Sequence, residues 1–274
     1  MRYALSMSQA ATSLPQEPTW EVRAPDTSHL ITDDGAPVDS FLSEKQMRLL
    51  TLPLYEGWSN PQERPMLAAA NVGVFAVPRN NPLVPDVFLS LDVETPKLTG
   101  DERNRSYFVW DFGKPPDVVI EIVSDTEGGE LTTKLRGYER MRVPNYVVFD
   151  PLGVASNEML SVFRLEGGAY VQQALKPLPG LEDATETTTR YAVITECGLG
   201  LRLWNGSYED ITETWLRWCE PDGALIPTGA ERAEHEAERA EHEAKRAEHE
   251  AKRAEDAERE LAKLRAELEQ LRRG

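Results

Sequence analysis

The sequence predicts an α/β protein that ends in a long, charged helix. A strand at 118–124 is followed by a helix at about 130–141 and a strand at 146–150, which together form one βαβ unit with a parallel strand pair. The residues from 230 onward repeat every seven positions and contain no proline, as is typical of a helical tail. With 274 residues, of which 40% are hydrophobic, the chain can bury a substantial core.

The elements before the βαβ unit follow from local patterns of apolar residues and proline. Residues 1–36 are rich in Pro, Ser, Thr and Asp and have no periodicity, so we expect a poorly ordered lead-in. Apolar residues recur at helical spacing over 40–55, which predicts an amphipathic helix there. The apolar runs 67–77 and 87–93 are each bounded by proline and are typical of strands.

The second half of the body is predicted to consist of short antiparallel strands. Gly167-Gly168 provides a hairpin turn between the first two of them. These predicted strands are 160–165, 169–175, 191–195 and 199–204. The chain then divides into a lead-in at 1–36, a globular domain at 37–220, a linker rich in Pro and Gly at 221–229, and a helix at 230–274.

One apolar stripe runs along a single face of the tail. Its spacing alternates between three and four residues, as in a coiled coil, and its residues change from alanine to leucine toward the end of the chain. A 3-3 spacing at Ala251, Ala254 and Ala257 marks a local change of phase. Either the tail is a coiled coil that makes the protein a homo-oligomer through 230–274, or it is a solvated single helix, because alanine buries little apolar area.

Composition excludes several classes of chemistry. The net charge is −17, of which −14 lies in residues 1–229, and this argues against a broad basic surface for nucleic acid. Only two cysteines, Cys197 and Cys219, are present, which excludes a disulfide framework and a thiolate zinc site. Three of the four histidines share one position of the tail repeat, where we expect them to be solvated, so the body has only His29. No apolar run is long enough to span a membrane, so we expect a cytoplasmic protein.

Glu121 is the residue that packing alone explains least well. It stands in the middle of an apolar run, VVIEIV, that is typical of a strand buried on both faces. An ionised carboxylate in such a place is costly unless a metal ion or a catalytic partner compensates its charge. The alternatives are that this face of the strand is partly solvated or that Glu121 pairs with an arginine.

Asp86 and Lys134 are the residues best placed to act with Glu121. Asp86 follows a proline and opens the preceding strand, although Asp at such a place is also common turn chemistry. Lys134 lies three residues after Leu131 and four before Tyr138, so it faces inward on the predicted helix unless its ammonium extends to solvent. Two carboxylates and a lysine suit a hard divalent cation that takes oxygen ligands and keeps its waters.

The order of these motifs resembles the Uma family of restriction-endonuclease-like proteins, which is grouped with the PD-(D/E)xK nuclease superfamily. The resemblance rests on Pro85-Asp86, the strand at 116–124, Lys134 with Tyr138 four residues later, and 143–151 (VPNYVVFDP). The helix near 40–55, the segment 199–231 and the charged tail also resemble family members, so the similarity covers most of 40–274. It implies a restriction-endonuclease-like mixed sheet flanked by helices.

Carried over to this chain, the resemblance implies Asp86 and Glu121 as ligands of Mg²⁺ (or Mn²⁺) and Lys134 as the third catalytic residue. The superfamily lysine stands two residues after the acid, where this chain has Val123, whereas the family takes its lysine from the following helix. The chain departs from the family at two places, where Ser124-Asp125-Thr126 replaces Ser-Pro and Tyr146-Val147 replaces a frequent Tyr-Trp.

Two hypotheses of function follow from these residues. The first is a metal-dependent DNA endonuclease that hydrolyses phosphodiester bonds, with weak and salt-sensitive DNA binding aided by the four basic residues in 134–142. The second is a catalytically inactive nuclease-fold module that assembles with partners through the coiled coil. A hydrolase acting through Cys197 or Cys219 is a remote third, since His29 is the only histidine of the body.

Overall fold

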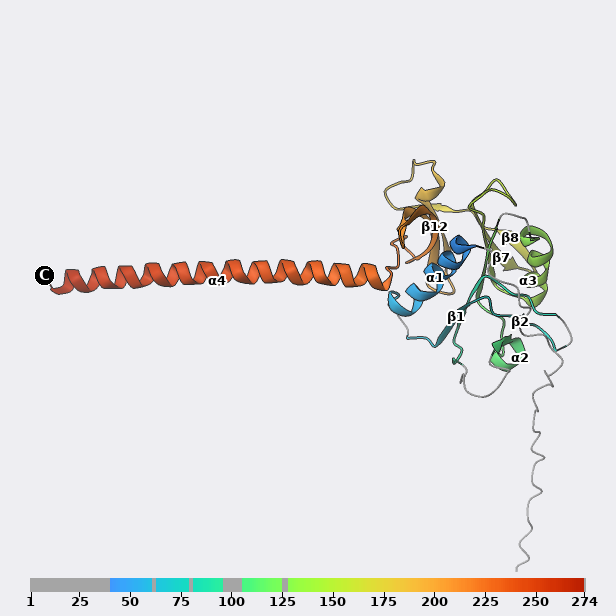
Figure 1. Ribbon diagram of the computed structural model, residues 1–274, viewed down its shortest axis with the longest axis horizontal. Helices are drawn as coiled ribbons and strands as arrows, with labels where there is room; N and C mark the ends of the chain where they lie inside the picture. The colour runs from blue at the N-terminus through green and yellow to red at the C-terminus, as the bar shows by residue number, and fades with distance from the viewer. Residues whose placement is uncertain (1–39, 61–62, 79–80, 96–104, 125–127, 274) are drawn as a thin grey trace, which may run out of the picture.

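The computed structural model describes residues 40–60, 63–78, 81–95, 105–124 and 128–273. Its body contains three sheets and its C-terminal helix projects far from them (Figure 1). The lead-in predicted at 1–36 lies outside the described residues.

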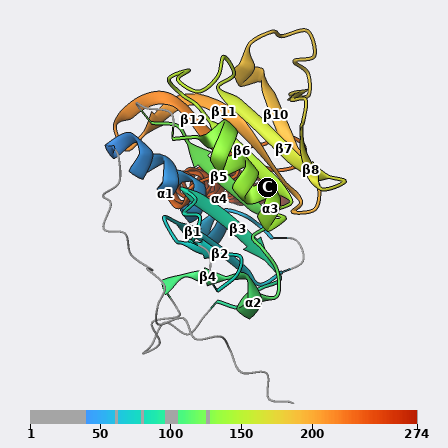
Figure 2. The ribbon, with the colours of Figure 1, turned by 90° about the vertical axis from the view of Figure 1, so that its right-hand side faces the viewer.

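A six-stranded mixed sheet forms the centre of the body (Figure 2). In spatial order its strands are β1 (Met66–Ala70), β3 (Val87–Leu91), β5 (Val118–Ile122), β6 (Asn145–Phe149), β7 (Leu160–Glu166) and β8 (Ala169–Gln172). β5 and β6 run parallel, and the other neighbouring pairs are antiparallel. The predicted βαβ unit is therefore confirmed, and so is the mixed α/β fold class.

Two smaller sheets complete the body. The four-stranded antiparallel sheet contains β9 (Lys176–Pro177), β10 (Arg190–Ile194), β11 (Leu199–Tyr208) and β12 (Ile211–Cys219). The two-stranded parallel sheet pairs β2 (Val74–Phe75) with β4 (Tyr107–Phe108). The short helical segments are α2 (Val109–Phe112) and η3 (Thr187–Thr189).

The two faces of the central sheet belong to different apolar clusters. On one face Val118, Ile120 and Ile122 of β5 pack in a cluster with residues of α1 (Phe41–Glu56) and of the four-stranded sheet. On the other face Val119 packs in a cluster with Tyr138 of α3 (Leu135–Met141). All five residues of β5 are buried, as the apolar run predicted, so any polar group on this strand must find partners inside the protein.

Several local features differ from the sequence prediction. The single strand expected at 67–77 is broken into β1 and β2, because Asn71 adopts a left-handed φ of 53° that a continuous strand does not allow. The helix expected at 130–141 begins with a π-helical turn, η2 (Glu130–Lys134), before α3. Strand β12 was not predicted, and its buried Arg217 interrupts the apolar pattern that would have indicated a strand.

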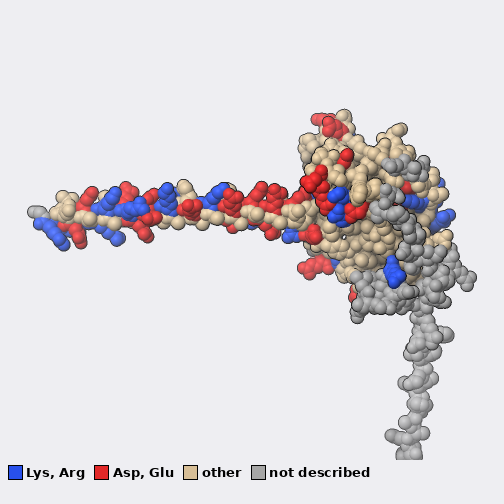
Figure 3. Space-filling model, in the orientation of Figure 1, with Lys and Arg blue, Asp and Glu red and all other residues tan. Residues whose placement is uncertain are grey.

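The last 45 helical residues form one helix, α4 (Gly229–Arg273), about 67 Å long from the rise per residue. A capping box begins it: the Glu231 amide donates to Thr228 Oγ1 at 3.2 Å and the Thr228 amide donates to Glu231 Oε2 at 2.8 Å. Glu231 also forms a bidentate ion pair with Arg217, whose two nitrogens lie 2.8 and 2.6 Å from its oxygens. The helix start is thus fixed to β12, while the rest of α4 projects into solvent with acidic and basic side chains interleaved (Figure 3).

Candidate active site

The Glu121 side chain is fully buried on the α3 side of the central sheet. Its Oε1 accepts a hydrogen bond from the Tyr138 hydroxyl at 2.7 Å, and its Oε2 lies 2.8 Å from Lys134 Nζ. Both partners come from the helical segment that connects β5 to β6, so the crossover of the βαβ unit delivers them to the strand. The partner of the buried acid is therefore a lysine, not the arginine considered as an alternative.

Asp86 lies beside Glu121, directly before the first residue of the neighbouring strand β3. In the antiparallel register of β3 and β5, Val87 pairs with Ile120, and one further step places Asp86 opposite Glu121. The Ile122 amide donates to Asp86 Oδ2 at 2.6 Å, which fixes the carboxylate against the end of β5. The structure thus brings together all three residues that the sequence singled out, Asp86, Glu121 and Lys134.

Burial and the neighbouring Asp86 both affect the ionisation of Glu121. Burial raises the pKa of Glu121, and the negative charge of Asp86 raises it further. Lys134 and Tyr138 act in the opposite direction, and the net result is a pKa of about 8. The Glu121 carboxyl therefore keeps its proton to a higher pH than an exposed glutamate does, even with Lys134 in place.

Lys134 stays protonated in this environment. Burial lowers its pKa, but the charges of Glu121, Asp86 and Glu130 outweigh burial and hold the pKa well above its ordinary value. Its Nζ also lies 3.3 Å from Glu130 Oε1. Lys134 can consequently donate hydrogen bonds and stabilise negative charge, but it cannot act as a general base.

Tyr138, Glu130 and Tyr146 belong to this site although the sequence reasoning gave them no role in it. The Tyr146 hydroxyl donates to the Glu130 carbonyl at 2.7 Å, which holds the π-helical turn against β6. The carboxylate of Glu130 is itself buried and accepts from the Gly128 amide at 2.9 Å. The signal that could have found Glu130 and Tyr138 is their spacing, four residues before and four after Lys134 on one helical face.

The donor set fits a hard divalent cation. Magnesium is bound by one or two carboxylates and keeps several waters, and each carboxylate oxygen retains a second lone pair after accepting one hydrogen bond. Asp86 and Glu121 provide two such groups, with a surplus of negative charge that a cation would offset. Within the described residues, no group of three or more His, Cys, Asp or Glu is arranged to hold a metal ion.

Exposed basic side chains lie along the helix that follows Lys134. Arg136, Arg140 and Arg142, in and directly after α3, are exposed, and Arg136 pairs with Glu139 at 3.1 Å. Figure 3 shows Lys and Arg side chains at the edge of the body where Figure 1 places α3. The sequence predicted this local basic patch on an otherwise acidic body.

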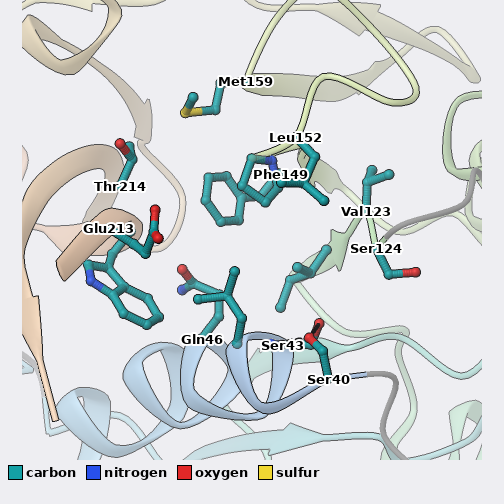
Figure 4. Close-up of a pocket in the computed structure, with 14 residues that line it drawn as sticks. Ser40, Ser43, Gln46, Val123, Ser124, Phe149, Leu152, Met159, Glu213 and Thr214 are labelled. Atoms are coloured by element: carbon teal, nitrogen blue, oxygen red, sulfur yellow. Dashed lines mark hydrogen bonds between the residues drawn. The ribbon is translucent and has the colours of Figure 1, made fainter. Parts of the chain in front are cut away.

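A separate pocket of about 340 Å³ lies at the end of β5, against α1 and β12 (Figure 4). Its walls include Leu42 and Gln46 of α1, Ile122 of β5, Phe149 of β6 and Trp215 of β12. The face of β5 that carries Ile122 is opposite to the face that carries Glu121, so this pocket and the carboxylate pair are on different sides of the sheet.

The central mixed sheet and the buried acid–lysine pair define a protein of the restriction-endonuclease-like class. The family model Uma2, described as "Putative restriction endonuclease", matches residues 34–191, which is more than half of the chain. The chain belongs to this family, whose description suggests a nuclease that acts on DNA. No curated protein matches the chain significantly. None of the described helices is long and apolar enough to cross a membrane.

Proposed function

We propose that this protein is a metal-dependent DNA endonuclease in which Asp86, Glu121 and Lys134 form the active site. The observation that carries the proposal is the fully buried Glu121 carboxylate, which lies between a lysine and a second carboxylate. A buried acid with a pKa raised to about 8 beside an opposite charge is typical of a functional site. The membership of the restriction-endonuclease-like family supports the reaction class.

Asp86 and Glu121 would hold Mg²⁺ or Mn²⁺. When bound, such an ion supplies positive charge that polarises the phosphodiester and acidifies the attacking water. The backbone amide of Ile122 keeps Asp86 in place, and Tyr138 keeps Glu121 in one rotamer, so the two carboxylates need little rearrangement to bind it.

Lys134 would stabilise the negative charge that develops on the phosphate or orient the attacking water. Its high pKa keeps the ammonium protonated, so its contribution is electrostatic and not that of a base. The exposed arginines of the patch around α3 would contact the DNA backbone, and the acidic remainder of the body would make this binding weak and sensitive to salt.

A plasmid cleavage assay tests the proposal. The wild-type protein should nick or linearise plasmid DNA in Mg²⁺ or Mn²⁺ and stop when EDTA is added, and Glu121→Gln should be at least about a hundredfold slower. Glu139→Gln is the matched control, since this glutamate lies on α3 and accepts from the Tyr170 amide at 2.9 Å outside the proposed site. Equal cleavage by wild type and Glu121→Gln would indicate a contaminating nuclease and exclude the role of Glu121.

Calorimetry separates metal binding from cleavage. With the pKa of Glu121 at about 8, binding of Mn²⁺ near pH 7 should release a proton from the site, which buffers of different ionisation enthalpy reveal. Glu121→Gln should lose both the binding and the proton release. A wild-type protein that neither binds metal nor cleaves DNA would contradict the proposal and favour the second candidate function.

That second candidate is a non-catalytic binding module on a nuclease fold, which assembles with partners through α4. The observation in its favour is that Tyr138 and Lys134 already occupy one hydrogen-bonding position on each oxygen of Glu121. A buried carboxyl group whose two oxygens both accept hydrogen bonds from the protein stabilises the fold without a bound metal ion.

A further inference from the structure

The helix α4 consists of two sections that differ in the residues along their apolar stripe. The first section, 230–253, carries only alanine on the stripe, whereas the second section, 254–273, carries Ala254 and Ala257 followed by leucine. The four leucines Leu261, Leu264, Leu268 and Leu271 are 53%, 53%, 59% and 80% exposed. Four large apolar side chains on one face of a helix that projects from the body do not contribute to the core of the body. Such an exposed apolar face is typical of an interaction site.

The charges beside the stripe also differ between the sections. Each heptad contains two stripe positions. In a parallel, in-register coiled coil, the residue directly before the first of them on one helix lies close to the residue numbered five higher on the other helix. In the first section these pairs are Glu236 with Glu241, Glu243 with Glu248, and Glu250 with Glu255. Every pair joins two negative charges, so two copies of this section repel each other.

The second section has the opposite pattern. Across the change of phase the corresponding pair is Arg253 with Glu258, and beyond it the pairs are Glu260 with Arg265 and Glu267 with Arg272. Every pair joins opposite charges. In an antiparallel arrangement, by contrast, Glu260 would face Glu267 and Arg265 would face arginine, so only the parallel arrangement satisfies these charges.

The charges that flank the stripe of the second section form no ion pair within the part of the chain that the structure describes. Among the described residues, Glu260, Arg265, Glu267 and Arg272 form no ion pair, whereas Arg259 on the outer face pairs with Glu255 at 2.6 Å. The charged side chains that border the leucines are therefore available to a second helix.

We propose that 254–273 is a self-association surface, and that its partner is a second copy of the same chain, parallel and in register. Leucine burial supplies the driving force, and the Glu–Arg pairs set the orientation and the partner. The acidic flanks of 230–250 keep the first sections apart. Since the capping box and the pair of Arg217 with Glu231 fix the start of α4 to the body, both bodies lie at the same end of the assembly.

Charge reversal in the full-length chain tests the pairing. In sedimentation equilibrium, we expect the fraction of wild-type dimer to rise with protein concentration. The double variant Arg265→Glu/Arg272→Glu should raise the dissociation constant of this dimer at least about tenfold. Glu260→Arg/Glu267→Arg should do the same, and mixing the two variants should restore association. Lys263→Glu/Arg273→Glu is the matched control, because it makes the same charge change on the outer face and should leave association unchanged.

Cross-linking tests the orientation. Leu271→Cys introduces a thiol at the last stripe position, while the native Cys197 and Cys219 are buried. A parallel, in-register pair brings the two new thiols together and should give a covalent dimer under mild oxidation, whereas an antiparallel pair would hold them about 20 Å or more apart. A monomeric wild type, an equal loss of association in the control variant, or no cross-link in a dimer would overturn the proposal.

Discussion

Each end of β5 carries a carboxylate that is paired with a lysine, and the two pairs differ in their surroundings. At the start of the strand, Asp117 Oδ2 lies 2.6 Å from Lys114 Nζ and accepts from the Leu91 amide at 2.7 Å. At the end, Glu121 pairs with Lys134 at 2.8 Å. The two lysine side chains are almost equally exposed, at 30% and 31%.

The difference lies in the acids and in their other partners. The side chain of Asp117 is 17% exposed. Its partner Lys114 also donates a hydrogen bond to the Leu91 carbonyl at 2.8 Å, so this pair is bonded to the backbone of the neighbouring strand. Glu121 is 0% exposed, has only side-chain partners, and faces a second carboxylate. The same pair of residue types thus fastens two strands at one end of β5, whereas at the other end it includes a fully buried acid whose pKa is raised to about 8.

The largest expected effect concerns the two lysines. If only the Glu121 end is catalytic, Lys134→Met should slow metal-dependent plasmid cleavage by about a hundredfold or more, because it removes the positive charge that stabilises the phosphate. Lys114→Met removes an equally exposed lysine that also pairs with a carboxylate, and it should change the rate by less than about threefold. Similar rates for the two variants would show that the two ends of β5 do not differ in function.

The next effect is a difference in how stability depends on pH. The pKa of Glu121 is raised from 4.5 to about 8, so between these values the unfolded chain releases a proton that the native protein keeps. The free energy of unfolding should therefore fall as pH rises from about 4.5 to 8 in the absence of metal. Glu121→Gln should flatten this slope and be about 2 kcal/mol more stable than wild type at pH 8, less than the full linkage because Lys134 loses its ionic partner.

Urea unfolding at pH 5 and pH 8 in EDTA measures this effect. Asp117→Asn is the control from the other end of the strand, and it should lower stability at both pH values because the Leu91 amide and Lys114 lose an acceptor. A Glu121→Gln protein that is destabilised at pH 8 as strongly as Asp117→Asn would contradict the raised pKa of Glu121.

A smaller effect is expected at Tyr138. Tyr138→Phe removes the buried donor to Glu121 Oε1, which should cost about 1–2 kcal/mol of stability and raise the pKa of Glu121 further. Metal binding, followed by calorimetry, should then require a higher pH. Tyr170→Phe also removes a hydroxyl, one that donates to the Val143 carbonyl at 2.9 Å, and it should lower stability without moving the pH of metal binding.

The smallest effect concerns the exposed arginines near the Glu121 end. Arg140→Gln should weaken DNA binding about two- to threefold at low salt. It should also reduce the slope of the logarithm of affinity against the logarithm of salt concentration by about one. Fluorescence anisotropy with a labelled duplex in a salt series provides the measurement. Arg239→Gln in the tail is the control, and an equal loss there would mean that DNA is attracted by the charge of the chain as a whole.

The sequence predicted the centre of the fold well because its signals are local. Val118, Val119 and Ile120 around Glu121 form a run too apolar for anything but a buried strand, and the glycine pair at 167–168 adopts positive φ values, as a tight hairpin turn requires. Strand β12 escaped prediction, because its buried Arg217 depends on partners outside the strand, among them Glu231, fourteen residues away. A pattern that depends on a distant partner cannot be found in a short window of residues.

The same distinction applies to the candidate site. Glu121 could be singled out from its neighbours in the chain, and Lys134 from its position on a helix, because each observation needs only a few adjacent residues. That Asp86 is opposite Glu121 follows from the register of β3 and β5, which the sequence does not specify. The role of Tyr138 as a donor to the acid likewise depends on how closely the crossover helix packs against the sheet.

By itself, the sequence determined the class of fold, the buried acid and the charge pattern of the tail, because all three are properties of residues close together in the chain. The tertiary structure alone decided which acids meet, which lysine compensates them, and that the Asp117 pair closes onto backbone while the Glu121 pair does not. The physical reason is that burial and register set the free energy of a charge. Neither quantity is defined until strands and helices far apart in the sequence have packed together.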